Sequence, residues 1–317
     1  MNSFPPTLPA GAASLPSQDR QRTLKAAIGC VGTGVHSGCR INMKLHPAAE
    51  GRGVVFRRSD LGAELPARFD YVADTRLCTL LADPAHPELR IGTIEHLLAA
   101  LAGLQIDNVL VELDGPEVPI LDGSAAPFVF LLECAGILEQ DAPRPIIEVL
   151  RPVRVQAGAA FAELRPAAPG LDLALSIEFP AAAIGTQALA LSLNPSTFRR
   201  ELARARTFAL AEEVEQLRQA GLGRGGSLDN AVVVDGARVL NPAGLRMRDE
   251  FVRHKLLDVV GDLALAGAAI HARFSGHRSG HALNNRLLQA LFADSANWQG
   301  TGPAPAAASR APVPAAA

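Results

Sequence analysis

With 317 residues, of which 48% are hydrophobic, the chain is long enough to bury a sizeable core and to form two domains. Its net charge of −2 and the absence of any run of Lys or Arg argue against nucleic acid or a membrane surface as a partner, and no stretch holds the roughly 18 apolar residues that span a bilayer. The four cysteines form no CxxC pair and are too sparse for a disulfide framework, so the composition favours a cytoplasmic protein that acts on small molecules.

Both ends of the chain are low in complexity. Residues 1–19 are rich in proline and lack the basic start and continuous apolar core of a signal peptide. Residues 300–317 consist mainly of Pro and Ala. Segments of this composition cannot bury enough apolar surface to fold, so we expect disordered tails at 1–19 and 300–317.

The first half of the intervening sequence alternates strands with helices. Residues 40–45 and 53–58 alternate polar and apolar side chains as strands do, and glycine-rich turns separate them. Residues 93–104 have the composition of a helix, with Thr93 as a candidate N-cap. A strand and a second helix follow, at 108–113 and 125–135.

Two glycine-rich runs look like nucleotide-binding loops but lack the residues that such loops need. In the run 29–38, Ser37 stands where the third glycine of a dinucleotide-binding motif should be. The run 221–230 lacks the Lys-Ser/Thr ending of a phosphate loop. We interpret both as turns, the second lying between an amphipathic helix at 205–220 and a strand at 231–234.

A Pro-rich link at 142–145 precedes a second half that repeats the order of elements in the first. His254 opens a helix there, and an apolar strand, a small-residue turn and another helix follow, at 268–274, 279–282 and 284–292. The sequence therefore predicts a duplicated α/β unit, with domains at 20–143 and 144–299.

Residues 249–262 concentrate ionisable side chains in a segment whose apolar spacing predicts a buried helix. His254, Asp258 and Asp262 follow one another at intervals of four residues, so they lie on one face of that helix. A His and a carboxylate at this spacing can bind one zinc ion, which needs at least three protein ligands. On spacing alone a surface pair is the commoner explanation, and a metal site needs a third ligand from elsewhere.

Glu95 and His96 lie in the first turn of the helix predicted at 93–104. A lone His there is usually capped or solvated, yet a Glu beside a His is also how a general base and a metal ligand are delivered together. If the two halves pack about a pseudo-twofold axis, His96 and His254 both face the interface between them. The duplication thus offers His96 as the third ligand.

Six sequence blocks stand out from the rest of the chain: TIEHL (93–97), ILDGSAAPF (120–128), RARTF (204–208), GGSLDN (225–230), FVRHKLLD (251–258) and SGHALNN (279–285). In this order they resemble the zinc-dependent UDP-3-O-acyl-N-acetylglucosamine deacetylases of lipid A synthesis. The resemblance runs from about residue 21 to residue 298. It implies a cytoplasmic enzyme that removes the N-acetyl group from UDP-3-O-acyl-N-acetylglucosamine and releases acetate.

The resemblance also implies the fold. It predicts an α+β protein of two similar layered α/β domains, packed about a pseudo-twofold axis with the active site between them. A small β-α-β insert in the second domain, at about 207–234, would form an apolar passage for the acyl chain. We expect four apolar residues to line it: Phe208, Val214, Ala231 and Val233. We expect a monomer.

Carried over position by position, the resemblance gives the metal ligands as His96, His254 and Asp258. The metal would be Zn²⁺, although two His and one carboxylate also accept Fe²⁺. Three protein ligands leave an open position for water, whose pKa then falls to near 7. Outside the acyl passage, the residues that would bind substrate are Cys78, Lys255 and Arg278.

The same resemblance divides the proton transfers between two residues. Glu95 would be the general base, and His281 would be the acidic or electrophilic partner, oriented by Asp262. Thr207 would polarise the amide carbonyl. This division makes chemical sense, because an amide needs its departing nitrogen protonated as well as a proton taken from water.

Two positions depart from the family pattern. Arg278 stands where a Lys is familiar, which keeps a positive charge for a phosphate but changes the geometry of the contact. Ala209 follows Thr207 and Phe208 where a Gly is common, which bears on the shape of this loop.

Two other classes of function are open to argument. A non-catalytic UDP-sugar or acyl-binding module of the same fold would lack a metal ligand or an acid–base residue. The sequence has all three expected metal ligands and both expected acid–base residues. A metallopeptidase usually carries HExxH on one helix, whereas His96 and His254 lie far apart in this chain. Metal analysis together with an assay of acetate release would decide between these functions.

Overall fold

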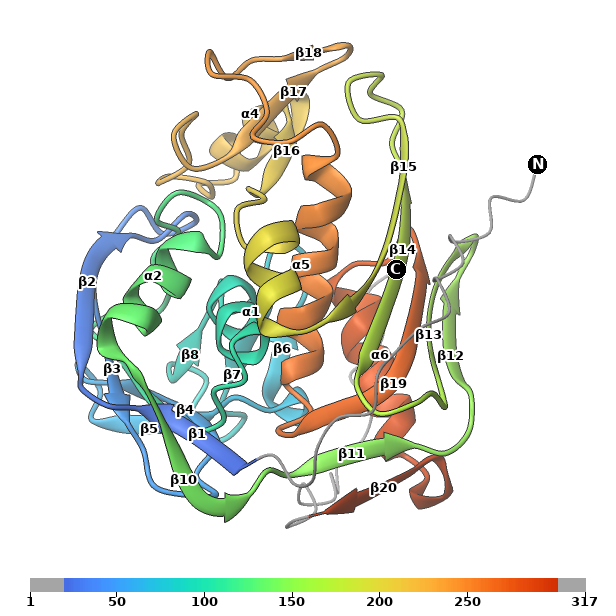
Figure 1. Ribbon diagram of the computed structural model, residues 1–317. Coiled ribbons are helices and arrows are strands. Elements are labelled where there is room, and N and C mark those ends of the chain that lie inside the picture. Colours follow the sequence, from blue (N-terminus) through green and yellow to red (C-terminus); the bar gives the residue numbers. More distant parts are fainter. Residues whose placement is uncertain (1–19, 302–317) are drawn as a thin grey trace.

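The computed structural model describes residues 20–301 of the chain. The tails predicted from composition, residues 1–19 and all but the first two residues of 300–317, lie outside the described residues. Figure 1 shows two halves, each with its own sheet, on either side of a central pair of helices, α1 (Glu95–Gly103) and α5 (Glu250–Ala264). This arrangement confirms the predicted α+β class with two layered halves.

Alternating side chains build the sheet of the first half. In β3 (Arg40–Pro47) the side chains of Ile41, Met43 and Leu45 are buried between exposed neighbours, because successive residues of a strand point to opposite faces. They share one core with the apolar side chains of α1 and α2 (Ala126–Ala135). Across this five-stranded sheet the strands run in the order β2 (Ile28–Thr33), β3, β9 (Val109–Leu113), β4 (Val54–Arg58) and β5 (Ala63–Pro66). A smaller sheet holds β6 (Val72–Asp74), β7 (Leu80–Ala82) and β8 (Arg90–Ile91).

The second half is built around β19 (Ala269–His277), which pairs in parallel with β11 and β14 and antiparallel with β13. Helix α6 (His281–Phe292) packs against β12 and β13. The other strands of this seven-stranded sheet are β11 (Ile146–Val149), β12 (Val153–Ala157), β13 (Ala160–Arg165), β14 (Leu171–Glu178), β15 (Thr186–Leu193) and β20 (Trp298–Thr301). Short helical segments lie at η1 (Phe69–Tyr71), α3 (Pro195–Thr197), η2 (Phe198–Leu202) and η3 (Ser295–Asn297).

In each half the first strand pairs with the last. β1 (Arg20–Leu24) pairs antiparallel with β10 (Ile137–Pro143), and β11 pairs antiparallel with β20. We therefore propose that the domain boundary lies between β10 and β11, in the Pro-rich link. Gly300 and Thr301 extend the fold into the segment predicted as a tail, because their backbones pair with Ile147 and Ile146.

The second half carries the predicted β-α-β insert, formed by β16 (Phe208–Leu210), α4 (Ala211–Gln219) and β17 (Val232–Asp235), with β18 (Arg238–Val239) beyond it. β16 and β17 pair in parallel, and Figure 1 shows the insert above the start of α5. The single helix predicted at 205–220 is wrong in its first six residues. Pairing of Phe208 with Val232 in the small sheet outweighs the helical composition of this stretch.

Helices α1 and α5 pack in close contact where α5 carries a glycine. A Cβ atom at Gly261 would lie 2.0 Å from the carbonyl oxygen of Glu95, so only a residue without a side chain fits there. This close approach brings the start of α1 against the last third of α5.

Three details of the predicted helices are wrong. Thr93 does not cap α1: its φ is +55°, and its hydroxyl donates to Glu117 Oε1 at 2.9 Å instead. His254 does not open its helix, because α5 begins at Glu250 and His254 is its fifth residue. His281, placed in a turn by its small neighbours, is the first residue of α6. The exact first residue of a helix is less well determined by local composition than the presence of the helix itself.

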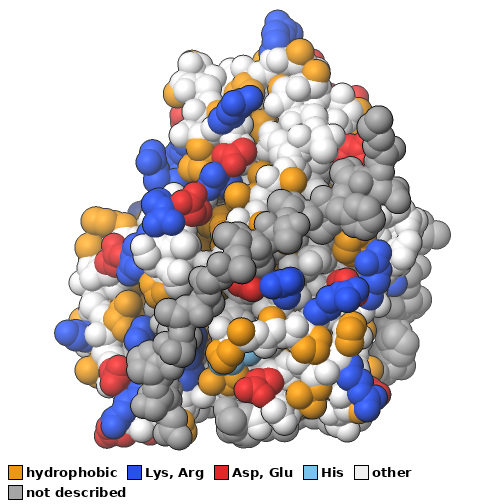
Figure 2. Space-filling view, turned by 45° about the vertical axis from the view of Figure 1, so that its right-hand side comes forward, with side chains coloured by type: hydrophobic (Ala, Val, Ile, Leu, Met, Phe, Trp, Pro, Cys, Tyr) orange, Lys and Arg blue, Asp and Glu red, His pale blue; other side chains and the backbone are white. Residues whose placement is uncertain are grey.

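Where grey atoms do not cover it, the surface in Figure 2 carries basic and acidic side chains interspersed with apolar ones. None of the helices within residues 20–301 has the length and hydropathy needed to cross a bilayer.

Candidate active site

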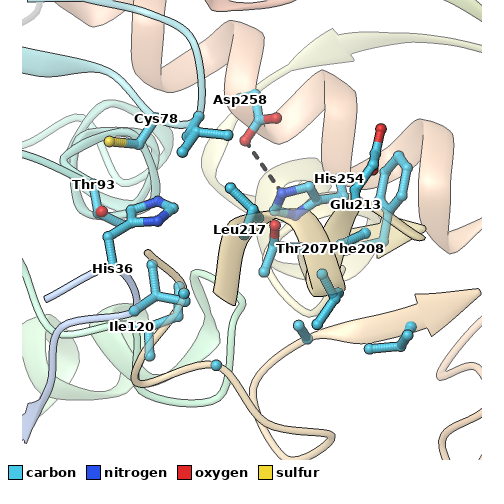
Figure 3. A pocket seen from close by; sticks show the side chains of 18 of the residues that line it. His36, Cys78, Thr93, Ile120, Thr207, Phe208, Glu213, Leu217, His254 and Asp258 are labelled. Carbon is cyan, nitrogen blue, oxygen red and sulfur yellow. Dashed lines mark ion pairs between the residues drawn. The ribbon is translucent and has the colours of Figure 1, made fainter. Parts of the chain in front are cut away.

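Two histidines and an aspartate from different halves meet between α1 and α5. His96 comes from the first turn of α1, whereas His254 and Asp258 lie one turn apart on α5. One nitrogen or oxygen atom from each lies within 4.8 Å of the other two. The Nε2 atoms of His254 and His96 are 3.3 and 3.8 Å from Asp258 Oδ1, and Figure 3 marks the first of these contacts.

This cluster fits a divalent metal ion. Asp258 Oδ1 is buried and accepts no hydrogen bond from any group within residues 20–301, although its partner Oδ2 accepts one from Lys255 Nζ at 2.8 Å. Burial lowers the pKa of His254 and that of His96, the latter to about 3, so both rings are neutral as metal ligands must be. His254 Nδ1 lies 3.1 Å from the carbonyl oxygen of Ala205, which leaves Nε2 free to face the cluster.

Glu95 and His281 lie next to this cluster and face each other. Glu95 Oε1 is 3.9 Å from His281 Nε2, and the other nitrogen of His281 is 2.8 Å from Asp262 Oδ2. Asn284 also donates to Asp262 Oδ2, at 2.8 Å. Asp262 therefore fixes the orientation of the imidazole from the side remote from Glu95.

The two groups titrate in opposite directions from their ordinary values. Burial raises the pKa of Glu95 to about 7, against the opposing charge of His281. Burial lowers the pKa of His281, but the charge and hydrogen bond of Asp262 outweigh it and raise that pKa to about 9. Near neutral pH the carboxylate can accept a proton and the imidazolium can donate one, which is what a general base and a general acid require.

A pocket of about 650 Å³ opens onto these groups. Figure 3 shows that its walls come from both halves, with His36, Cys78 and Ile120 on one side and residues of the insert on the other. Near the cluster the lining is polar. On the side of the insert, the apolar lining residues are Val214 and Leu217 of α4, Val233 of β17 and Ala231 just before it, and α4 also contributes Glu213 and Gln216.

Comparison with known protein families matches residues 21–293 to the family described as UDP-3-O-acyl N-acetylglycosamine deacetylase. The chain belongs to this family. The resemblance seen in the six sequence blocks is thereby confirmed.

The names of similar proteins are consistent with membership of this family. A protein from Acidithiobacillus ferrooxidans named UDP-3-O-acyl-N-acetylglucosamine deacetylase is 50% identical over 284 residues, which cover 88% of this chain and 92% of the relative. Proteins of the same name from Idiomarina loihiensis and Myxococcus xanthus are 47% and 46% identical, over 88% and 90% of this chain and 92% and 90% of their own lengths.

The structure brings together nearly all the residues that the sequence proposed for a deacetylase site. Those that line the pocket are Cys78, Glu95, His96, Thr207, Phe208, Val214, Ala231, Val233, His254, Lys255, Asp258 and His281. Asp262 lies behind His281, outside the lining. Arg278 is also outside it, with a side chain 50% exposed and 4.0 Å from Glu178, so its contact with substrate stays a prediction.

Sequence reasoning missed His36 as a pocket residue. It lies in the glycine-rich run that was interpreted only as a turn, and Glu117 holds this loop by accepting hydrogen bonds from the backbone nitrogens of His36 and Ser37, at 2.9 and 3.0 Å. The available signal was a histidine flanked by glycines between two strands. Once this run had been found not to match a dinucleotide-binding motif, its histidine was not considered further as a site residue.

Proposed function

We propose that this chain hydrolyses the N-acetyl group of UDP-3-O-acyl-N-acetylglucosamine, releasing acetate and a free amine, in lipid A biosynthesis. Membership of the deacetylase family and the names of the relatives support the substrate. The observation that carries the proposal is the convergence of a three-residue metal-type cluster with Glu95 and His281 in one pocket.

We propose Zn²⁺ as the metal, held by His96, His254 and Asp258, because two neutral imidazoles and a carboxylate with an open fourth position are typical of catalytic zinc sites. The same donors also bind Fe²⁺. When bound there, the metal would polarise the amide carbonyl and acidify a water molecule. Metal analysis of the purified protein tests the identity of the ion.

The protein's own side chains would carry the proton transfers. Glu95 accepts a proton from the attacking water, and His281 donates its proton to the departing nitrogen, so that the C–N bond breaks to leave a neutral amine. Thr207, on the pocket wall, would donate a hydrogen bond to the amide oxygen as negative charge develops. The ion pair between Lys255 and Asp258 keeps a positive charge beside the same wall.

An assay of acetate release from UDP-3-O-acyl-N-acetylglucosamine by the metal-loaded protein tests the function directly. Loss of activity with a chelator and its return with added metal would support a hydrolytic site. Binding of this substrate without acetate release would instead support a UDP-sugar or acyl-binding module and reject the proposal.

Shortening the acyl chain of the substrate is expected to lower kcat/KM steeply. Phe208, Val214, Ala231 and Val233 present apolar surface along the pocket, and each buried CH₂ contributes about 0.8 kcal/mol, or roughly fourfold in affinity. A series of substrates of decreasing acyl length measures the effect. Ala231→Phe, which narrows the passage, should impair long-chain substrates more than the analogue without an acyl chain. Equal kcat/KM for acylated and non-acylated substrates would mean that these residues only pack a small core.

Asp262→Asn is expected to move the alkaline limb of the pH–rate profile to lower pH and to reduce kcat. His281 acts as an acid only while protonated, so activity is lost as the pH rises through its pKa. Burial lowers that pKa and the charge of Asp262 raises it to about 9, so removing the charge lets it fall. The acid limb follows Glu95, whose pKa burial raises to about 7. The full pH profile and the metal content of both proteins check this, and an unmoved alkaline limb in Asp262→Asn would contradict the acid role of His281.

A further inference from the structure

Thr79 connects the candidate base of one half to the candidate acid of the other. It lies immediately before β7 and is 1% exposed. Its backbone N–H donates to Glu95 Oε2 at 3.1 Å, and its hydroxyl donates to Asp262 Oδ1 at 2.6 Å. No other residue within 20–301 is hydrogen-bonded to both carboxylates.

These contacts form a closed ring. Asp262 Oδ2 meets His281 Nδ1 at 2.8 Å, His281 Nε2 faces Glu95 Oε1 at 3.9 Å, and Glu95 returns to Thr79. Because the hydroxyl of Thr79 holds Oδ1 while His281 and Asn284 hold Oδ2, the carboxylate of Asp262 cannot turn about its Cβ–Cγ bond without losing a hydrogen bond. Its orientation sets that of the imidazole.

We propose that Thr79 is a positioning residue, whose hydroxyl fixes Asp262 and thereby holds His281 at a set place relative to Glu95. This inference rests on the proposed hydrolytic function. The backbone N–H of Thr79 serves Glu95 whatever the side chain is, so the hydroxyl can be tested separately from the contact with the base.

Thr79→Val tests the hydroxyl, because valine keeps the shape of threonine and removes only its donor. We expect kcat to fall roughly 10- to 100-fold, the usual loss when a group that orients a catalytic or metal-binding side chain is removed. KM should change by less than about twofold, since no contact with substrate is lost, and metal content should stay unchanged. Thr79→Ser, which restores the hydroxyl, should return kcat to within about threefold of the original value.

Thr23→Val is the matched control. Thr23 is 4% exposed, and its hydroxyl donates to the carbonyl oxygen of Asn108 at 2.7 Å, outside the pocket lining. This variant should lose thermal stability while keeping kcat. If both variants show a similar fall in melting temperature but only Thr79→Val loses kcat, the loss of kcat is due to lost positioning of Asp262 and not to lost stability.

A double-mutant cycle shows whether Thr79 acts through Asp262. In the Asp262→Asn background, Thr79→Val should lower kcat by a much smaller factor than it does alone, because the carboxylate that the hydroxyl positions is already absent. Additive losses would overturn the inference, as would normal kcat in Thr79→Val or no recovery in Thr79→Ser. If the unmodified protein itself released no acetate, the proposed function would fail first, and the two failures are thus distinguishable.

Discussion

Replacing His254 by Ala is expected to remove both the bound metal and acetate release. His254 supplies one of the three donor atoms in the cluster, and alanine supplies none. Changing a group that merely supports a metal ligand typically costs about 10- to 100-fold in metal affinity or activity, so losing a ligand should cost more than about 100-fold in kcat/KM. Metal per protein after dialysis, measured together with kcat/KM, checks this expectation.

His86→Ala is the control for that experiment. The side chain of His86 is 66% exposed beside Asp83 and does not line the pocket, so this variant should keep both metal and activity. If His254→Ala still held one equivalent of metal, His254 would not be a metal ligand, whatever the activity of the variant.

Glu95→Gln is expected to keep the metal and to lose at least about 100-fold in kcat, the contribution usual for one general base. The amide has the same shape as the carboxylate and can still accept the hydrogen bond from Thr79, but it cannot take a proton from water. Rapid-quench or steady-state measurement of acetate release, with metal analysis of the same sample, separates loss of chemistry from loss of the ion.

Glu213→Gln is the matched control for Glu95→Gln. Glu213 also lines the pocket, but it lies on α4 and accepts a hydrogen bond from the backbone nitrogen of Leu210 at 3.0 Å. We expect it to change kcat little. Near-normal turnover in Glu95→Gln would reject the role of base and would leave the metal cluster without a proton acceptor on α1.

The part of the site that lies on single helices could be predicted from the sequence. The i,i+4 spacing places His254, Asp258 and Asp262 on one face of α5, because helical geometry is local. Glu95 and His96 are neighbours in the chain, so the sequence alone was enough to predict that both lie in the same part of the site. The pairing of these two sets depended on the duplication of the α/β unit and on the six blocks of the family resemblance.

The connections between segments could not be predicted in the same way. Thr79 and Asp262 are separated by 183 residues. The sequence around either residue gives no indication that the two are in contact. Thr93 looked like an N-cap because threonine often is one, yet its hydroxyl meets Glu117, 24 residues away. Local composition likewise favoured helix at 205–210, whereas residues 208–210 form β16 and pair with β17.

The way each half closes on itself has a consequence for how the protein is made. β10 leaves the ribosome before any strand of the second half, so the first half can complete its pairing with β1 while the rest is still being synthesised. The second half must wait for β20, at the end of the described chain, before β11 gains its antiparallel partner. Until α5 emerges, the nascent chain holds His96 alone among the three donors. The three donor atoms can therefore come together only after α5 has been synthesised, so the first half alone cannot form the cluster.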